Sequence, residues 1–163
     1  MSSYIPVLDK NDMMDAFANG MHERSIHYRA VVLSTVALGA TVSVVTARRH
    51  TIEAGYEKDL LRPTPPGLTK ELVYTYLTEA KRANSLPDSI SPSESSISGI
   101  VTCIHLFMAF EWLKDHDSSW EYLQMAVTRA QKLKVDQWGE TELRASDERR
   151  MFLSTRLRIY WLL

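Results

Sequence analysis

The residue types best suited to catalysis or metal binding are thinly spread along this chain. Its 163 residues include five histidines and one cysteine. The histidines are His22, His27, His50, His105 and His116. None belongs to a His-x-x-x-His or His-x-Glu pair that would place two ligands on one helix face. A single cysteine also excludes a disulfide framework and any multi-cysteine zinc site within the chain. We therefore expect no metal site and no cofactor here.

Two of these residues lie inside the apolar segment from Ile100 to Phe110. There we expect Cys103 to be a small core residue rather than a nucleophile, because a reactive thiol needs a polar and accessible setting. We expect His105 to be a hydrogen-bonded, semi-buried residue rather than a ligand. His22 and His116 stand beside acidic residues and are expected in solvated polar turns. Since the chain also lacks a glycine-rich phosphate loop and a serine elbow, no catalytic residues are assigned.

The aromatic residues of the second half could line a pocket for a small molecule. Ordinary core packing is the favoured alternative, because nearly all of them fall on helical stripes. Trp138 differs, since it sits in a polar connection and is expected to cover a core edge or contact a partner. The set consists of Phe107, Phe110, Trp112, Trp120, Tyr122, Trp138, Tyr160 and Trp161.

The overall charge does not favour nucleic acid or anionic lipid as a partner. The net charge is −1, and the apolar and charged fractions of 45% and 24% are those of a globular protein. Basic clusters occur at residues 48–50 and 144–158, and carboxylates interleave with the second. We interpret both as solvated faces and expect no direct DNA binding. The N-terminus lacks a signal-peptide pattern, which favours an intracellular protein.

The first half of the chain predicts a short helix and a long one. Asp9 can cap a helix through about Met21, with Met13, Met14 and Phe17 facing inward. A second helix is expected from about residue 25 to 47. Its uncharged span of 18 residues reaches the lower limit for a membrane helix, but hydroxyl side chains dilute it. We expect no membrane and predict a buried central helix, which other helices approach closely along its small residues Ala30, Ser34, Ala37 and Thr41.

Prolines and serines divide the chain beyond this helix. Residues 62–67 contain three prolines and predict a loop. Thr69 then caps a helix that ends near Ser85, with Leu68 and Val73 as its hydrophobic staple. Its inward residues are expected to be Leu72, Tyr76, Leu77, Ala80 and Ala83. Residues 86–98 hold two prolines and six serines and are expected to form an exposed connection. Ser91-Pro92-Ser93-Glu94 matches a helix start, so the next helix can begin within it.

Three further helices are predicted after this connection. The first runs to about Leu113, with a broad apolar face on Ile97, Ile100, Val101, Ile104, Met108 and Leu113. A turn at residues 115–117 and a capping box from Ser118 to Glu121 begin its antiparallel partner. On that second helix, the residues expected to face inward are Leu123, Ala126, Val127, Ala130 and Leu133. The last helix begins at Ser146 and reaches Leu163 while still apolar, with no stop signal.

No strand pattern interrupts these helices, so the sequence predicts an all-α fold. We expect a multi-helix array of antiparallel helix pairs around the buried central helix, forming one regulatory domain over residues 1–163. Exposed connections are expected near residues 50–68 and 86–98. Because the last segment is apolar to its end, we expect the array to be C-terminally truncated at Leu163 and prone to self-association.

The order of motifs in the second half resembles the middle homology region of fungal six-cysteine zinc-cluster transcription factors. That family has a helix with an Ala-xxx-Ala-xx-Leu-x-Leu pattern, then an acidic-Arg-Arg segment, then an aromatic-Trp-Leu run. The corresponding residues are Ala126, Ala130, Leu133 and Val135, then Glu148-Arg149-Arg150, then Tyr160-Trp161-Leu162-Leu163. The likeness is best over residues 95–163, with a longer gap between the arginines and the tryptophan than in the compact family form.

The resemblance implies a non-catalytic regulatory region in the nucleus, which restrains or relays activation. Zinc is then expected only in an upstream DNA-binding domain that this chain lacks. The partners implied are other parts of the parent factor, co-regulators and a small-molecule inducer, and the contacting residues stay unassigned. The alternative is an α-helical protein interaction module unrelated to transcription, and a small enzyme is a third hypothesis. Six cysteines encoded upstream would favour the first, and a downstream helix-pair repeat the second.

Overall fold

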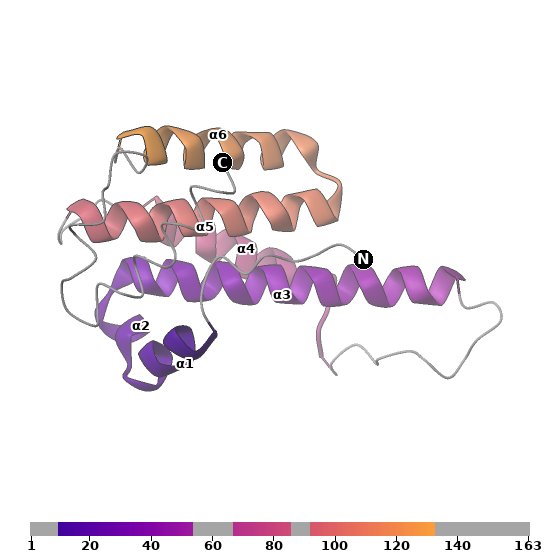
Figure 1. Cartoon of the computed structure of the whole chain (residues 1–163). Coiled ribbons are helices and arrows are strands. Elements are labelled where there is room, and N and C mark those ends of the chain that lie inside the picture. The colour runs from indigo at the N-terminus through magenta and orange to yellow at the C-terminus, as the bar shows by residue number, and fades with distance from the viewer. Residues whose placement is uncertain (1–9, 54–66, 86–91, 133–163) are drawn as a thin grey trace.

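The structure is a computed structural model that describes residues 10–53, 67–85 and 92–132 (Figure 1). These residues form six helices and no strand, so the all-α prediction is confirmed. The helices are α1 (Lys10–Ala18), α2 (Met21–Arg24), α3 (Ile26–Glu53), α4 (Lys70–Asn84), α5 (Pro92–Leu113) and α6 (His116–Lys132). Helices α3, α5 and α6 lie side by side, α4 packs against α3 and α5, and α2 packs against α3 (Figure 1).

The long helix α3 packs through its small residues, as predicted. Ala30, Ser34, Ala37 and Thr41 are all buried, and the hydroxyls of the two polar ones donate to backbone carbonyls of their own helix. Small side chains let the backbones of neighbouring helices approach closely. α5 is enclosed more completely than α3, because every residue from Ile97 to Leu106 is buried. The core therefore lies on both sides of α5, between α3, α4 and α6.

By length and composition, the segment Ile26–Thr46 of α3 is the one helix among the described residues that could cross a membrane. The core helix of a soluble protein and a signal sequence pass the same test, and 39% of the most apolar stretch of α3 is buried against the other helices. Val36, on the other side of α3, is 41% exposed.

The N-terminal helices differ from the predicted inward face. Met14 is 58% exposed and Phe17 is also exposed, whereas Ala16 is buried. The hydroxyl of Tyr28 in α3 donates to the Met13 carbonyl at 3.0 Å, so a backbone group of α1 makes this contact and the apolar side chains of Met14 and Phe17 do not supply a buried face. Gly20 ends the helix in the left-handed region, with φ of 68°, as expected of a glycine at this position.

The predictions for α4 are largely confirmed. The Thr69 hydroxyl accepts from the Leu72 N–H at 3.2 Å, which is the expected N-cap. Val73, Leu77, Ala80 and Ala83 are buried, while Leu72 and Tyr76 are half-buried. The exposed connection expected at residues 86–98 is shorter than predicted, because α5 already begins at Pro92 and its Ile97 and Ser98 are buried. Likewise, α3 continues to Glu53, so the connection expected from residue 50 begins later.

The turn between α5 and α6 confirms an antiparallel pair but corrects its cap. The Asp115 N–H donates to the Phe110 carbonyl and the Lys114 N–H to that of Glu111, with Lys114 at φ 63°, which is a Schellman ending. The carboxylate of Asp115 accepts from the Ser118 N–H at 3.2 Å. Asp115 is therefore the N-cap, and the predicted Ser118 capping box is wrong because the tight turn starts the helix three residues earlier.

The buried face of α6 also differs from the prediction. Ser119, Tyr122 and Ala126 are buried, and Ala130 packs against the core. Leu123 and Val127, expected to face inward, are only half-buried. The predictions for Leu133, Val135, Trp138 and the segment 144–163 lie outside the described residues, as does most of the loop at 62–67.

The close packing of α3 can be tested at Ala37, which is fully buried. We expect Ala37→Leu to lower the free energy of unfolding by about 1–3 kcal/mol, because the added carbons have no space in a packed core. Urea unfolding measures this change. Val36→Leu is the control, since the neighbouring side chain is exposed and its enlargement costs little. Equal stability of both variants would show that this face of α3 is open.

Candidate functional site

The strongest candidate for a functional site is a polar cluster where α4, α5 and α6 meet. Arg129 of α6 donates from Nη1 to the side-chain oxygen of Asn84 at 2.7 Å, and its Nη2 lies 3.5 Å from the Asn84 carbonyl. The Asn84 amide nitrogen lies 3.4 Å from Cys103 Sγ, and Arg129 Nη1 lies 3.6 Å from the same sulfur. One guanidinium thus joins the end of α4 to the middle of α5.

Gly99 provides the space that this guanidinium occupies. An alanine Cβ at this position would overlap Nη1 of Arg129 and lie 3.6 Å from the Asn84 side-chain oxygen. Asn84 is the last residue of α4, where backbone carbonyls lack partners within the helix and carry partial negative charge. Arg129 therefore places a positive charge at the C-terminus of α4, which stabilises that helix. This role is structural.

The thiol in this cluster is poorly suited to nucleophilic chemistry. Burial raises the pKa of Cys103, and the nearby Arg129 charge and the Asn84 hydrogen bond only partly oppose that effect. A thiol kept protonated inside the core reacts slowly. The prediction that Cys103 is a buried core residue is confirmed. Its sulfur accepts hydrogen bonds that connect three helices.

His105 forms a second buried polar cluster, between α3 and α5. Its Nδ1 lies 3.1 Å from the Ser34 hydroxyl and 3.3 Å from the Thr35 hydroxyl. Burial lowers its pKa from 6.5 to about 4, so the ring is neutral near neutral pH. The expected hydrogen-bonded role is confirmed, although the ring is fully buried rather than semi-buried.

The aromatic residues of α5 and α6 pack mainly into the core. Phe110 and Tyr122 stack with their centroids 5.8 Å apart, and the Lys81 ammonium lies 4.4 Å from the Phe110 ring centroid. Burial, helped by the nearby Glu121 charge and Cys103, raises the pKa of Tyr122 to about 12. Phe110, Tyr122 and Lys81 come from α5, α6 and α4, so their contacts hold these three helices together. Phe107 and Trp112 are half-buried against the core, whereas Trp120 is 61% exposed.

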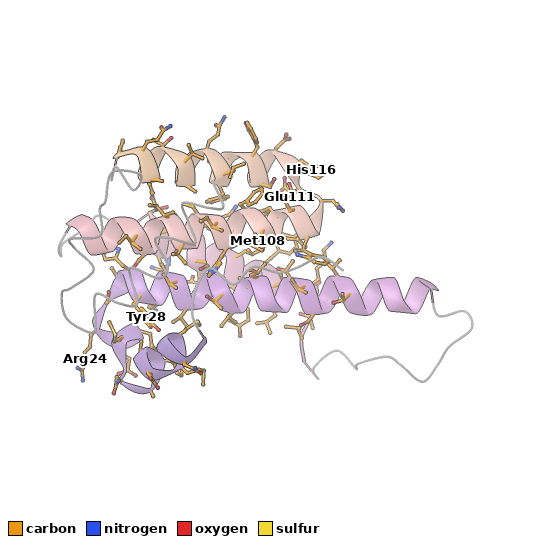
Figure 2. The ribbon with its side chains drawn as sticks, viewed as in Figure 1. Arg24, Tyr28, Met108, Glu111 and His116 are labelled. Atoms are coloured by element: carbon orange, nitrogen blue, oxygen red, sulfur yellow. The ribbon has the colours of Figure 1, made fainter. Side chains whose placement is uncertain are left out.

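A third polar group lies where α5 turns into α6, and Figure 2 shows Glu111 and His116 together there. The Glu111 carboxylate accepts from the Ser119 hydroxyl and lies 3.3 Å from His116 Nδ1. These hydrogen bonds lower the pKa of Glu111. The group links the end of α5 to the start of α6. His116 is exposed, as predicted, but it is the first residue of α6 and not part of the turn.

His22 is not in a purely solvated turn. It is half-buried and stacks on Phe17 at a centroid distance of 4.3 Å. Within the described residues, no group of three or more His, Cys, Asp or Glu side chains is arranged to hold a metal ion.

Sequence reasoning found Cys103 and His105 but missed Arg129 and Asn84. A helical arginine three residues after the buried Ala126 was a weak signal, because position 129 lies on the same side of α6 as Tyr122 and Ala126. The pairing with Asn84 spans 45 residues, and no local pattern predicts it.

The bridge from α6 to α4 can be tested with a double-mutant cycle. We expect Arg129→Met to lower the free energy of unfolding by about 1–3 kcal/mol, because Asn84 loses its charged partner. Asn84→Ala alone should cost a similar amount, and the double variant less than the sum, with a coupling of roughly 0.5–3 kcal/mol. Thermal and urea unfolding of the three variants give these values. Strict additivity would show that the two side chains are independent.

The chain was compared with models of protein families, with curated proteins and with solved structures, and none of the three comparisons found a match. The family indicated by the sequence motifs therefore stays a prediction.

Proposed function

We propose that this chain is a non-catalytic regulatory region of a transcription factor, of the kind found in the fungal zinc-cluster family. The observation that carries the proposal is the place of the motif alanines on α6. Ala126 is fully buried and Ala130 packs against the core. The spacing that suggested the family thus coincides with the packing face of a helix pair.

The use of the polar side chains supports a non-catalytic role. Cys103, His105 and Arg129 are three described residues whose side chains can take part in reactions, and each is bound to side chains of a neighbouring helix. A catalytic group needs access to substrate and a pKa suited to proton transfer or nucleophilic attack. The pKa values of Cys103 and His105 are instead shifted by burial, toward the neutral form of each.

A role inside a larger factor also fits the charge. With a net charge of −1, the chain has no excess of positive charge for phosphate contacts. Under this proposal, a separate zinc-containing domain recognises the DNA. The proposed partners are other segments of that factor and co-regulators in the nucleus. The proposed signal is a small-molecule inducer.

A reporter assay tests the proposal. The chain is placed between an unrelated DNA-binding domain and an activation domain in a fungal reporter strain. We expect the folded chain to change reporter output relative to a flexible linker of equal length. Output equal to that of the linker fusion, at equal protein level, would contradict a regulatory role.

An α-helical interaction module unrelated to transcription is the second candidate, and the exposed side chain of Trp120 favours it. Large exposed aromatic residues are frequent at the centre of protein interfaces. This candidate predicts no change in reporter output, and a partner whose binding is lost in Trp120→Gln.

A further inference from the structure

Ser85 is an exposed serine that directly follows the last residue of α4. Its N–H donates to the carbonyls of Lys81 and Arg82, and its hydroxyl donates to the Lys81 carbonyl at 2.9 Å. These hydrogen bonds close the C-terminal turn of the helix. Terminal turns open at a lower cost in free energy than helix interiors, so a modifying enzyme can reach this hydroxyl without unfolding the helical array.

Two basic residues precede this serine by three and four positions. Arg82 is exposed, and its guanidinium donates to the Glu79 carboxylate at 2.9 and 3.1 Å. Surface ion pairs of this kind contribute little to stability, so Arg82 exchanges its partner readily. Kinases that select an arginine three residues before a serine bind its guanidinium with their own carboxylates, through charge-assisted hydrogen bonds. Lys81 adds a second positive charge in the same turn.

We propose that Ser85 is a phosphorylation site for an arginine-directed protein kinase, and that Arg129 binds the resulting phosphate. The co-substrate is ATP. The bond between its γ-phosphorus and the β,γ-bridging oxygen breaks, and a bond from Ser85 Oγ to that phosphorus forms. The hydroxyl proton passes to an aspartate of the kinase, and ADP leaves with the bridging oxygen.

Arg129 of α6 lies close enough to Ser85 to bind this phosphate. Its Nη2 is 3.5 Å from the carbonyl oxygen of Asn84, and the carbon of that carbonyl is bonded directly to the Ser85 nitrogen. Its Nη1 donates to the neutral side chain of Asn84 at 2.7 Å. A phosphate with a charge of about −2 is a stronger acceptor than an amide oxygen, so the guanidinium gains by exchanging Asn84 for the phosphate.

Phosphorylation then acts on α4 in two opposite ways. The phosphate places negative charge at the C-terminus of the helix, which the helix dipole disfavours, and it removes the hydroxyl hydrogen that bonds the Lys81 carbonyl. The new bond to Arg129 offsets this cost. The modification thereby changes the contact through which α6 holds the end of α4. This inference does not depend on the proposed role in transcription.

A kinase assay on the full chain tests the site. The chain is incubated with ATP and a calmodulin-dependent protein kinase that selects arginine three residues before serine, and phosphate at Ser85 is measured by mass spectrometry of peptides. We expect Arg82→Gln to slow phosphorylation of Ser85 by roughly tenfold or more, because the recognised charge is lost. Glu79→Gln is the matched control, since it removes only the partner of Arg82 and should leave the rate equal or higher.

Two outcomes of this assay would overturn the proposed site. One is the absence of phosphate at Ser85 when the kinase phosphorylates a control peptide. The other is an equal rate in Arg82→Gln and the parent chain, because Ser85 would then be modified without recognition of the arginine.

Thermal unfolding tests the role of Arg129. The Tm is measured with and without phosphate for the parent chain and for Arg129→Met. The cost of negative charge at the helix end is common to both, so the comparison isolates the bond to the guanidinium. We expect phosphorylation to lower the Tm of Arg129→Met by roughly 2–4 °C more than that of the parent.

Arg129→Lys covers the case in which Arg129→Met does not fold. Lysine keeps the charge but cannot form the two parallel hydrogen bonds of a guanidinium, so phosphorylation should again lower the Tm more than in the parent. Equal changes of Tm in the parent chain and the Arg129 variant would show that Arg129 does not bind the phosphate.

Discussion

We expect acidification from pH 6.5 to about 4 to lower the free energy of unfolding by roughly 3 kcal/mol through His105. Above pH 6.5 the ring is neutral in both the folded and the unfolded chain, so its contribution is complete. Below pH 6.5 the unfolded chain binds a proton that the buried ring does not take up until about pH 4. The unfolded state is therefore stabilised progressively across this range.

Urea unfolding at a series of pH values measures this effect, and His105→Asn is the comparison. Asparagine can still hydrogen-bond Ser34 but does not titrate. The variant should be less stable at neutral pH because its side chain is smaller, and its stability should depend less steeply on pH between 6.5 and 4. Carboxylates contribute equally to both proteins, so the difference between the two curves isolates the ring. Parallel curves would show that His105 is not buried.

The second large effect is expected at Leu106, which is fully buried in α5. Leu106→Ala should lower the free energy of unfolding by about 2–5 kcal/mol, because it removes apolar contact and leaves a cavity. Domains of this size are stable by only about 5–15 kcal/mol, so the variant should be partly unfolded at moderate temperature. The urea midpoint should fall with little change in the slope of the transition.

Leu72→Ala is the control for this experiment, because Leu72 on α4 is only half-buried. It should cost clearly less than Leu106→Ala. Equal costs at the two positions would mean that the centre of α5 is not the centre of the core.

The features that were predicted correctly depend on local pattern. Thr69 caps α4 because its hydroxyl reaches an N–H three residues later, and the surrounding residues reveal that geometry. The small-residue face of α3 was likewise visible in its spacing, and the apolar run around Cys103 and His105 indicated burial. Such signals need no knowledge of the rest of the fold.

The features that were missed depend on contacts distant in sequence or on competing local signals. Two cap patterns overlap between residues 115 and 121, and the Schellman ending of α5 favours Asp115 over Ser118. Leu123 and Val127 are only half-buried, because the side of α6 with Tyr122 and Ala126 is the one that packs. The bridge from Arg129 to Asn84 joins α6 to α4 across α5, so only the packed helices reveal it.

The most direct test of the regulatory role is reporter output across variants of graded stability. The fusion described above is made with the parent chain, Val36→Leu, Ala37→Leu and Leu106→Ala, and output is plotted against the measured folded fraction of each chain. If the folded helical array regulates transcription, Val36→Leu behaves as the parent, and the effect declines through Ala37→Leu to Leu106→Ala. An effect that is the same in all four fusions at equal protein level would contradict the account.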